Sequence, residues 1–413
     1  MTPPPMDRRS VLQAAAAGSL LPWLPLHGWS WQADRAGPDA SQVVVGKDPR
    51  LIVHGAEPVE IETPLELLRG HRLTPAELIF VRNNQQLEDT LTLAVPKNPD
   101  DWTVDFTGLV EQPRQLKVGA LAALPQIEVE MVLQCSGNGR YFFHQVHPSK
   151  PGDKLWAAGA LANLRFGGVA LRTVFEHLKL RPKAEARFIT AQGKDRPLKA
   201  GVDDFEHSLP LDDALARTLL ATRLNGAPLP AIHGGPVRLV TPGYYGTVNV
   251  KWLHVLSLDA HESRNYHHER RYRTPRDPVP PGSDWVSTLE NSEANWRMKV
   301  KSVIWNPLAG EKLRPGRHKI QGVAWNDGSC PLEAVEISLD RGQSWRRAQV
   351  DKPASPFAWY VWQLEADLPA GKADLWARAI DAWGRTQPLS GAIHWNPGGY
   401  AWNGVHQVQV DVG

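Results

Sequence analysis

The chain of 413 residues is 42% hydrophobic and 22% charged, so it is long enough for two or three globular domains and is neither disordered nor fibrous. Lysine and arginine number 46 against 44 aspartate and glutamate residues, which excludes a protein that binds nucleic acid or anionic membranes over its whole surface. The two cysteines, Cys135 and Cys330, are too few for a four-thiolate metal site or a disulfide framework, and no CxxCH motif for covalent haem is present.

The N-terminal segment, residues 1–45, has the pattern of an export signal. Arg8 and Arg9 precede an alanine- and leucine-rich stretch of roughly 15 residues, shorter than the about 20 needed to span a bilayer. The arginine pair resembles the twin-arginine motif, whose pathway exports folded proteins; an ordinary secretory signal is the alternative. We therefore expect a periplasmic protein without a membrane span after the signal is removed.

Residues 46–265 mix short β-type runs with helical stretches, which predicts an α+β fold class with a mixed α/β domain here. The predicted strands are Leu78–Val81, Leu91–Val95, Val237–Thr241 and Val248–Leu256, and the predicted helices are Ala120–Leu124, Leu171–Leu178 and Leu211–Ala221.

A basic, proline-rich run at residues 266–284 lacks hydrophobic periodicity and predicts an interdomain linker. Beyond it, in residues 285–413, turn signals recur between short apolar runs, which predicts an immunoglobulin-like β-sandwich. Its predicted strands include His318–Ala324, Ala334–Leu339, Ala358–Leu364 and Ala373–Ile380. Eleven of the 17 tryptophans fall in this segment, where they could fill a core or form an interface.

Cys135 ends an apolar run and is followed at once by the turn sequence Ser-Gly-Asn-Gly, so the thiol stands at a strand end where a loop can present it to a ligand. Such a cysteine can be a buried small hydrophobe, a nucleophile or a metal thiolate, and on this fragment alone the buried structural role is the commonest. Basic residues occur in nearby motifs, with Arg140 five residues later, Arg82 in a Phe-Val-Arg-Asn segment and Arg238 before a glycine turn.

Taken together, these segments resemble the sulfite oxidase family of mononuclear molybdenum enzymes over nearly all of residues 60–410. No single segment is specific, but their shared order is. The matching segments are FVRN (80–83), LQCSGN (133–138), LW (155–156), FGGV (166–169), SLP (208–210), HGGPVR (233–238), PGYYG (242–246), VKWL (250–253), GVAW (322–325), SLDRGQSW (338–345) and WNPGGYAWN (395–403).

The resemblance implies a molybdopterin cofactor, a pyranopterin dithiolene carrying one molybdenum, with no haem in this chain. Cys135 matches the position that supplies the one soft thiolate the metal needs from the protein. Arg238, Lys251 and His233 match the donors for the terminal phosphate, although the first two could instead be solvated strand residues. The full set of implied cofactor-binding residues is Arg82, Asn83, Asn84, Cys135, Ser208, His233, Arg238 and Lys251.

The same resemblance implies oxidation of sulfite to sulfate by oxygen-atom transfer at the Cys135-ligated oxo-molybdenum centre. Arg82 and Arg140 match the arginines that hold the substrate by electrostatic preorganisation, and Trp156 and Tyr272 match pocket aromatics. Tyr266, six residues before Tyr272, is the alternative to it.

Two departures put details in doubt, because Asn84 stands where relatives often have histidine and Gly139 where they often have the first of two arginines. The pocket could therefore be less cationic, and the substrate something other than free sulfite.

The chain shows no second redox centre, so a partner must accept the electrons, and the resemblance implies a periplasmic c-type cytochrome rather than oxygen. It also implies a homodimer formed through the C-terminal domain; a lectin-like sandwich is the alternative. Three alternative functions remain: a sulfane-sulfur dehydrogenase subunit of a thiosulfate-oxidising complex, a sulfoxide reductase, and a cofactor-free exported binding protein. Sulfoxide reductases of this fold lack the dimerisation domain, so residues 285–413 count against that option.

Overall fold

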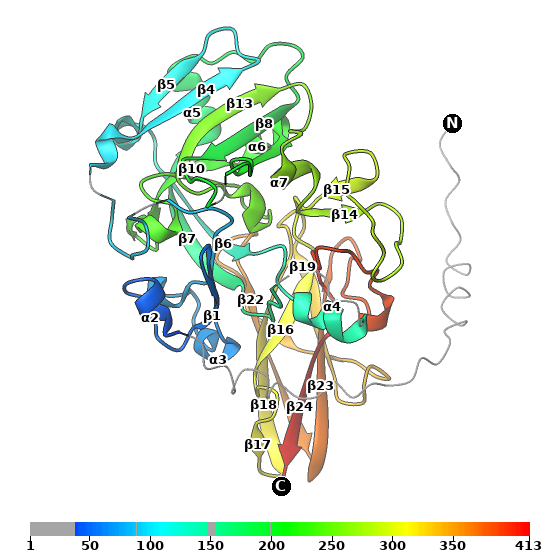
Figure 1. The fold of residues 1–413 in the computed structure, drawn as a ribbon. Coiled ribbons are helices and arrows are strands. Elements are labelled where there is room, and N and C mark those ends of the chain that lie inside the picture. Colours follow the sequence, from blue (N-terminus) through cyan, green and yellow to red (C-terminus); the bar gives the residue numbers. More distant parts are fainter. Residues whose placement is uncertain (1–37, 88, 97, 148–153, 199) are drawn as a thin grey trace.

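The computed structural model describes residues 38–87, 89–96, 98–147, 154–198 and 200–413 (Figure 1). The arginine pair and the apolar stretch of the predicted export signal lie outside these residues. The chain forms a mixed α/β part and, extending from it toward the C-terminus, a sandwich of two sheets (Figure 1). Within the described ranges, no helix is both long and apolar enough to cross a bilayer.

The mixed part begins with a small antiparallel sheet in the order β1-β2-β3. Its strands are β1 (Ile52–Ala56), β2 (Val59–Glu62) and β3 (Val81–Arg82), accompanied by the short helices α2 (Ala40–Val43) and α3 (Leu65–Leu68). All four residues of β2 are buried. This strand therefore brings two carboxylates, Glu60 and Glu62, into the interior.

Two five-stranded sheets form the body of the mixed part. In the first, β11-β10-β7-β6 follow one another and β12 also pairs with β10. In the second, the order is β5-β4-β13-β8-β9, with β13 and β4 parallel and the other neighbours antiparallel. The strands are β4 (Thr103–Gly108), β5 (Arg114–Lys117), β6 (Ile127–Gln134), β7 (Leu161–Ala170), β8 (Phe188–Gly193), β9 (Glu206–Pro210), β10 (Leu219–Leu224), β11 (Ala227–Pro228), β12 (Arg238–Val240) and β13 (Leu253–Asp259).

Helices connect these strands. The α-helices are α4 (Arg140–Val146), α5 (Leu171–Leu178), α6 (Leu211–Arg217) and α7 (Tyr266–Glu269), and the 3₁₀ helices are η2 (Ala76–Leu78), η3 (Pro99–Asp101), η4 (Val118–Ala123), η5 (Ala231–His233), η6 (Gly246–Val248) and, near the C-terminus, η7 (Ser390–Ala392). Helix α5 buries Leu171, Val174 and Phe175 along one face and ends at Leu178, with Lys179 as a C-cap in the left-handed conformation. The predicted helix Leu171–Leu178 is thus confirmed.

Other predicted elements are shifted or wrong. The predicted helix Leu211–Ala221 ends at Arg217, because the next apolar run forms β10 and pairs with β7. The predicted strand Leu91–Val95 is wrong, since only Thr92 makes an isolated bridge, to Val45.

Four further predictions are partly right. The stretch predicted as helix Ala120–Leu124 is the 3₁₀ helix η4, and only the last residue of predicted strand Leu78–Val81 enters β3. The predicted strand Val237–Thr241 contains β12, and the predicted strand Val248–Leu256 enters β13 only at Leu253.

The segment predicted as a linker, residues 266–284, carries regular structure at its start. Helix α7 buries His267 and His268, and β14 (Arg273–Pro275) pairs with β15 (Ser292–Ala294). Its first ten residues therefore belong to the packed structure of the protein.

The C-terminal part is a sandwich, as predicted, and its four predicted strands correspond to β18, β19, β22 and β23. One sheet has the order β16-β18-β22-β21 and the other β17-β24-β23-β19-β20. Its strands are β16 (Lys301–Asn306), β17 (Lys312–Leu313), β18 (Gly316–Trp325), β19 (Leu332–Ser338), β20 (Arg346–Arg347), β21 (Gln349–Val350), β22 (Tyr360–Leu368), β23 (Gly371–Asp381) and β24 (His406–Val412).

Four tryptophans of the C-terminal part belong to two different cores. Trp362 packs between the two sheets of the sandwich. Trp305, Trp325 and Trp359 instead join the large apolar core that contains Tyr244 of the mixed part. The sandwich is therefore joined to the mixed part through buried aromatic side chains.

Candidate functional site

A cavity lies where β3, the end of β6 and the segment from η5 to β13 come together. Its empty space, with the solvent at its mouth included, is about 740 Å³. Eight of the eleven residues predicted for the site line this cavity: Arg82, Asn83, Asn84, Cys135, His233, Arg238, Lys251 and Tyr272.

Cys135 follows directly after β6 and lines the cavity, although only 7% of its surface is exposed. Its backbone N–H donates to Ala160 O at 3.0 Å, and the N–H of Gly137 donates to the thiol Sγ at 3.4 Å. Burial raises the pKa of this thiol, while the nearby guanidinium of Arg82 acts in the opposite direction. A neutral thiol beside a cavity, with cationic charge nearby, can bind a metal ion as a thiolate.

Arg82, Asn84 and Tyr272 form one hydrogen-bonded group at the cavity wall. Asn84 Oδ1 accepts from Arg82 Nη2 at 2.9 Å and from the Tyr272 hydroxyl at 2.6 Å. On its other side, Arg82 Nη1 lies 3.2 Å from Glu60 Oε1. An amide oxygen has two lone pairs at any pH, so asparagine at position 84 holds both neighbours without titrating.

The backbone of Tyr272 is strained where it places the ring in this group. Tyr272 is 3% exposed and has a φ of 56°, a left-handed conformation that side chains other than glycine rarely take. Tyr266, the alternative pocket tyrosine, is 49% exposed and does not line the cavity. The geometry therefore selects Tyr272.

The other end of the cavity is cationic. Arg238 donates from Nη1 to His233 O at 2.9 Å and from Nη2 to Asn249 O at 2.7 Å, but its buried Nε has no partner among the described residues. Burial lowers the pKa of Arg238 to about 9 and that of Lys251 to about 7. Burial also lowers the pKa of His233 well below its usual value.

These buried donors fit an anionic group. Among the described residues that line the cavity, Asp195 is the one carboxylate, and burial raises its pKa to about 6. A buried guanidinium with an unused N–H gains free energy when that N–H donates to an anion such as a phosphate. The thiol and the cationic donors in one cavity therefore suit a phosphate-bearing cofactor that also supplies ligands to a metal.

Three predicted site residues do not line the cavity. Arg140 donates from Nε to Gly398 O at 2.7 Å and from Nη1 to Lys154 O at 2.9 Å, although its charge still acts on the Cys135 thiol. Trp156 is fully buried beside the ring of His54. Ser208 lies in β9 and bonds to Thr190 Oγ1 at 2.8 Å. The structure places their side chains beside or behind the wall of the site.

Sequence reasoning missed Lys47, Glu60, Asp195 and Arg271. Lys47 Nζ lies 2.9 Å from His233 Nε2 and donates to the carbonyls of Ala76 and Ile79, at 2.7 Å and 2.6 Å. Burial lowers the pKa of Lys47 and the pKa of His233 well below their ordinary values. Lys47 lies 186 residues from its partner, so no local pattern marked it. The guanidinium carbon of Arg271 lies 5.4 Å from the centroid of the Tyr272 ring, and its signal in the sequence is weak, namely that it stands directly before Tyr272.

The C-terminal part holds the loop that carries the thiol. The N–H of Ala401 donates to Ser136 O at 2.7 Å, and Trp325 Nε1 donates to Gln134 Oε1 at 2.9 Å. In Figure 1, α4, which begins at Arg140, lies beside the C-terminal segment drawn in red. The turn after Cys135 is thus fixed from both parts of the chain.

Trp402 occupies the space that a side chain at position 139 would need. Its φ is 98°, and a Cβ there would lie 2.6 Å from Trp402 Cδ1. Packing against Trp402 and the left-handed backbone therefore exclude an arginine at this position.

We expect Gly139→Ala to lower the free energy of unfolding by about 2 kcal/mol, from backbone strain together with overlap with Trp402. Gly226→Ala is the matched control, because Gly226 has a φ of 85° but no atom within 4 Å of its added Cβ. Urea unfolding curves should show the smaller loss for Gly226→Ala, and equal losses in both variants would contradict the packing explanation.

Two family models match this chain, and known proteins are similar to it along most of its length. Residues 92–267 match the family described as oxidoreductase molybdopterin binding domain, and residues 292–413 match the Mo-co oxidoreductase dimerisation domain. The mitochondrial sulfite oxidase of Homo sapiens is 32% identical over 378 residues, which cover 89% of this chain and 66% of that enzyme. Sulfite oxidase of Gallus gallus is 32% identical over 376 residues, covering 87% of this chain and 78% of that protein.

A solved structure is also similar. The sulfane dehydrogenase SoxCD from Paracoccus pantotrophus superposes with a TM-score of 0.71 and 25% identity, over 86% of this chain and 84% of the other.

Proposed function

Because the chain belongs to the sulfite oxidase family of molybdopterin oxidoreductases, we propose that it oxidises sulfite to sulfate and passes the two electrons to a c-type cytochrome. The observation that supports this most directly is the single cavity that holds the Cys135 thiol, the Arg82 guanidinium and the cationic end at Arg238 and Lys251. One wall suits the metal and the substrate, and the other suits the cofactor phosphate.

The bound cofactor would supply oxygen-atom transfer and the storage of two electrons, with Cys135 as its protein ligand. The chain's own residues would bind and orient the anion. Arg82 is fixed by Asn84 and Glu60, so its guanidinium is preorganised and needs little rearrangement when sulfite arrives. Tyr272 adds a hydroxyl whose position is set by the same Asn84 oxygen.

Glu60 reduces the positive charge that Arg82 presents. Its carboxylate lies 3.2 Å from Arg82 Nη1 and 3.8 Å from Lys154 Nζ. A partly neutralised guanidinium binds a dianion less tightly than a free one, which favours release of sulfate after the reaction.

The proposal is tested by measuring molybdenum content and sulfite-dependent reduction of cytochrome c on the same purified protein. We expect about one molybdenum per chain and reduction that stops when sulfite is omitted. Protein that contains molybdenum but does not turn over sulfite would contradict sulfite as the substrate.

A second candidate is oxidation of sulfane sulfur, which the structural similarity to the sulfane dehydrogenase SoxCD favours. Molybdenum-loaded protein that does not oxidise sulfite but reduces cytochrome c with a protein-bound persulfide would support this candidate.

We further propose a periplasmic location reached through the twin-arginine pathway, and a homodimer formed through residues 292–413, which match the dimerisation domain.

We expect Arg82→Gln to raise the KM for sulfite more than about tenfold, because a charge-assisted contact to the anion is lost. Steady-state kinetics at fixed cytochrome c measures this. Arg165→Gln is the control, since Arg165 is a partly exposed arginine whose side chain reaches Glu130 at 3.6 Å. An unchanged KM in Arg82→Gln would remove this arginine from the substrate site.

A further inference from the structure

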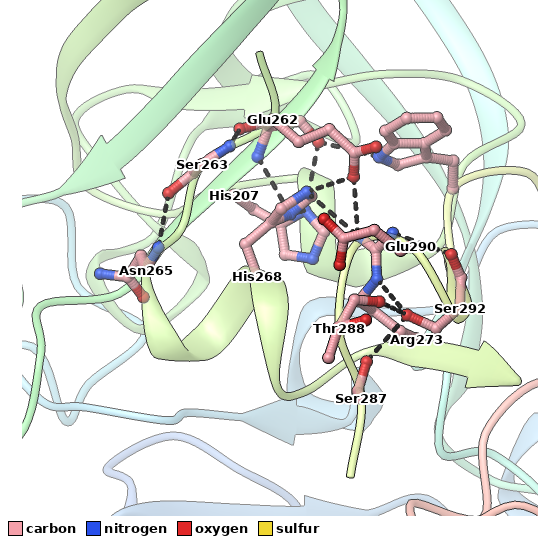
Figure 2. A network of polar contacts seen from close by, with 12 residues as sticks. His207, Glu262, Ser263, Asn265, His268, Arg273, Ser287, Thr288, Glu290 and Ser292 are labelled. Carbon is pink, nitrogen blue, oxygen red and sulfur yellow. Dashed lines mark hydrogen bonds and ion pairs between the residues drawn. The ribbon is translucent and has the colours of Figure 1, made fainter.

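Next to Tyr272 along the chain, a buried polar network joins three segments of the protein (Figure 2). Its centre is Glu262 Oε2, which accepts from Arg273 Nη1 at 2.7 Å and from His268 Nε2 at 2.8 Å. The side chains of Arg273 and His268 are 1% and 0% exposed, and that of Glu262 is 19% exposed. None of these residues lines the cavity.

The protons of the network have one consistent arrangement. Burial raises the pKa of Glu262, but hydrogen bonds from His268 and Arg273 outweigh it and lower the pKa to about 2, so the carboxylate is ionised. His268 must then donate from Nε2, which leaves the lone pair on its Nδ1. His207 Nδ1, 3.0 Å away, is therefore the donor of the pair.

Arg273 extends the network to the next strand. Its Nε donates to Ser292 Oγ at 2.8 Å, and its Nη2 donates to Ser292 O at 3.1 Å. Ser292 Oγ also lies 2.9 Å from Ser287 Oγ. Figure 2 shows Arg273 between Glu262 on one side and the serines on the other. Each of its three nitrogens has a partner, so its position relative to β15 is fixed.

Tyr272 lies between the two anchored points. Arg273 follows it directly at the start of β14, and His268 stands four residues before it in α7. The left-handed backbone of Tyr272 would relax to a common conformation if neither flank were held. That relaxation would turn the phenol away from Asn84, whose Oδ1 lies 2.6 Å from the hydroxyl.

We propose that Glu262, with His268 and Arg273, is a positioning group that holds Tyr272 in its left-handed conformation and so keeps its hydroxyl in the substrate site. We call these three residues the Glu262 clamp. The inference rests on the proposed function, because Tyr272 would contact the sulfur oxyanion. The clamp residues themselves touch neither cofactor nor substrate.

The test compares Glu262→Ala, which removes the shared acceptor, with Glu262→Gln, which keeps an oxygen acceptor. The first readout needs no substrate: hydrogen–deuterium exchange of the amides in residues 270–274, in the complete, cofactor-loaded protein. We expect exchange there to be about tenfold faster in Glu262→Ala and close to wild type in Glu262→Gln. Unchanged exchange in Glu262→Ala would overturn the proposal.

The second readout is the kinetics of sulfite oxidation in a double-mutant cycle with Tyr272→Phe. We expect Glu262→Ala to raise the KM about fivefold with kcat within twofold, and to add little in the Tyr272→Phe background, because both changes remove the same hydroxyl contact. Fully additive effects would show that Glu262 acts without Tyr272 and would overturn the proposal. If the wild-type protein does not oxidise sulfite, the proposed function fails, and the exchange measurement still decides on the clamp.

Two further variants guard against a general loss of stability. Ser292→Ala removes one acceptor of Arg273 and should give a smaller change of the same kind if Glu262→Ala does not fold. Glu336→Gln is the matched control, since Glu336 accepts from Arg378 at 2.7 Å and 2.9 Å within the C-terminal sandwich. It should leave both the exchange of residues 270–274 and the KM unchanged; a rise in either would overturn the specific role of the clamp.

Discussion

Cys135→Ser is expected to lower sulfite-dependent reduction of cytochrome c by more than about 100-fold in a protein that still folds. Serine is smaller and harder than a thiolate, so it is a poor ligand for a soft metal centre, but it fits the same buried position. The N–H of Gly137, which donates to Sγ at 3.4 Å, can donate to the serine hydroxyl instead. Molybdenum content, thermal unfolding and activity should be measured on the same preparation.

Cys330→Ser is the matched control for this experiment. Cys330 is also a buried thiol, 9% exposed, but it lies in the C-terminal part, where its sulfur is 3.9 Å from Asn326 Nδ2. Its replacement should leave both molybdenum content and activity near wild type. Full activity in Cys135→Ser would defeat the assignment of Cys135 as the metal ligand.

Arg238→Gln is expected to weaken retention of molybdopterin roughly 100-fold, the effect of losing a strong charge-assisted contact to a phosphate. The free Nε of Arg238 and its pKa of about 9, lowered by burial, show a cation that has no carboxylate partner of its own. Glutamine keeps a polar group at the position but removes the charge and the paired donors. Pterin released on denaturation and molybdenum content measure the loss.

Arg223→Gln provides the comparison on the same sheet. Arg223 lies in β10, which pairs with β12, but its side chain is 36% exposed and reaches Glu128 at 3.8 Å. This variant should keep its full cofactor content. Equal retention of pterin by Arg238→Gln and Arg223→Gln would remove Arg238 from the cofactor site.

Much of the fold follows from local patterns, and the exceptions have a physical cause. The strands β18, β19, β22 and β23 correspond to short apolar runs that lie between turn signals, and helix α5 corresponds to a stretch with a helical apolar pattern. The run Leu219–Ala221 fits a helix or a strand equally well, and pairing with β7 decides for the strand. Residues Leu91–Val95 have strand-like composition but no partner strand beyond the single bridge at Thr92.

The residues of the site divide in the same way, into those marked by a local motif and those placed by tertiary contacts. Motif residues such as Arg82, Cys135 and Arg238 were found because the resemblance marks each position, and the fold brings them to one cavity. Arg140 does not line the cavity, and its Nε donates to Gly398 O, a contact across 258 residues that no motif reveals. Lys47 and Glu262 were missed for the same reason, because their partners are set by tertiary packing.

The C-terminal part fixes the loop that carries the Cys135 thiol, and this has a consequence for truncated forms of the protein. Every side chain that lines the cavity precedes residue 292, where the match to the dimerisation domain begins. A product that stops before that residue would contain the whole wall of the cavity but lack the N–H of Ala401 and the indole of Trp325, which anchor Ser136 and Gln134. Truncations between residues 292 and 325 should therefore disturb the site even though they leave every cavity-lining residue in place.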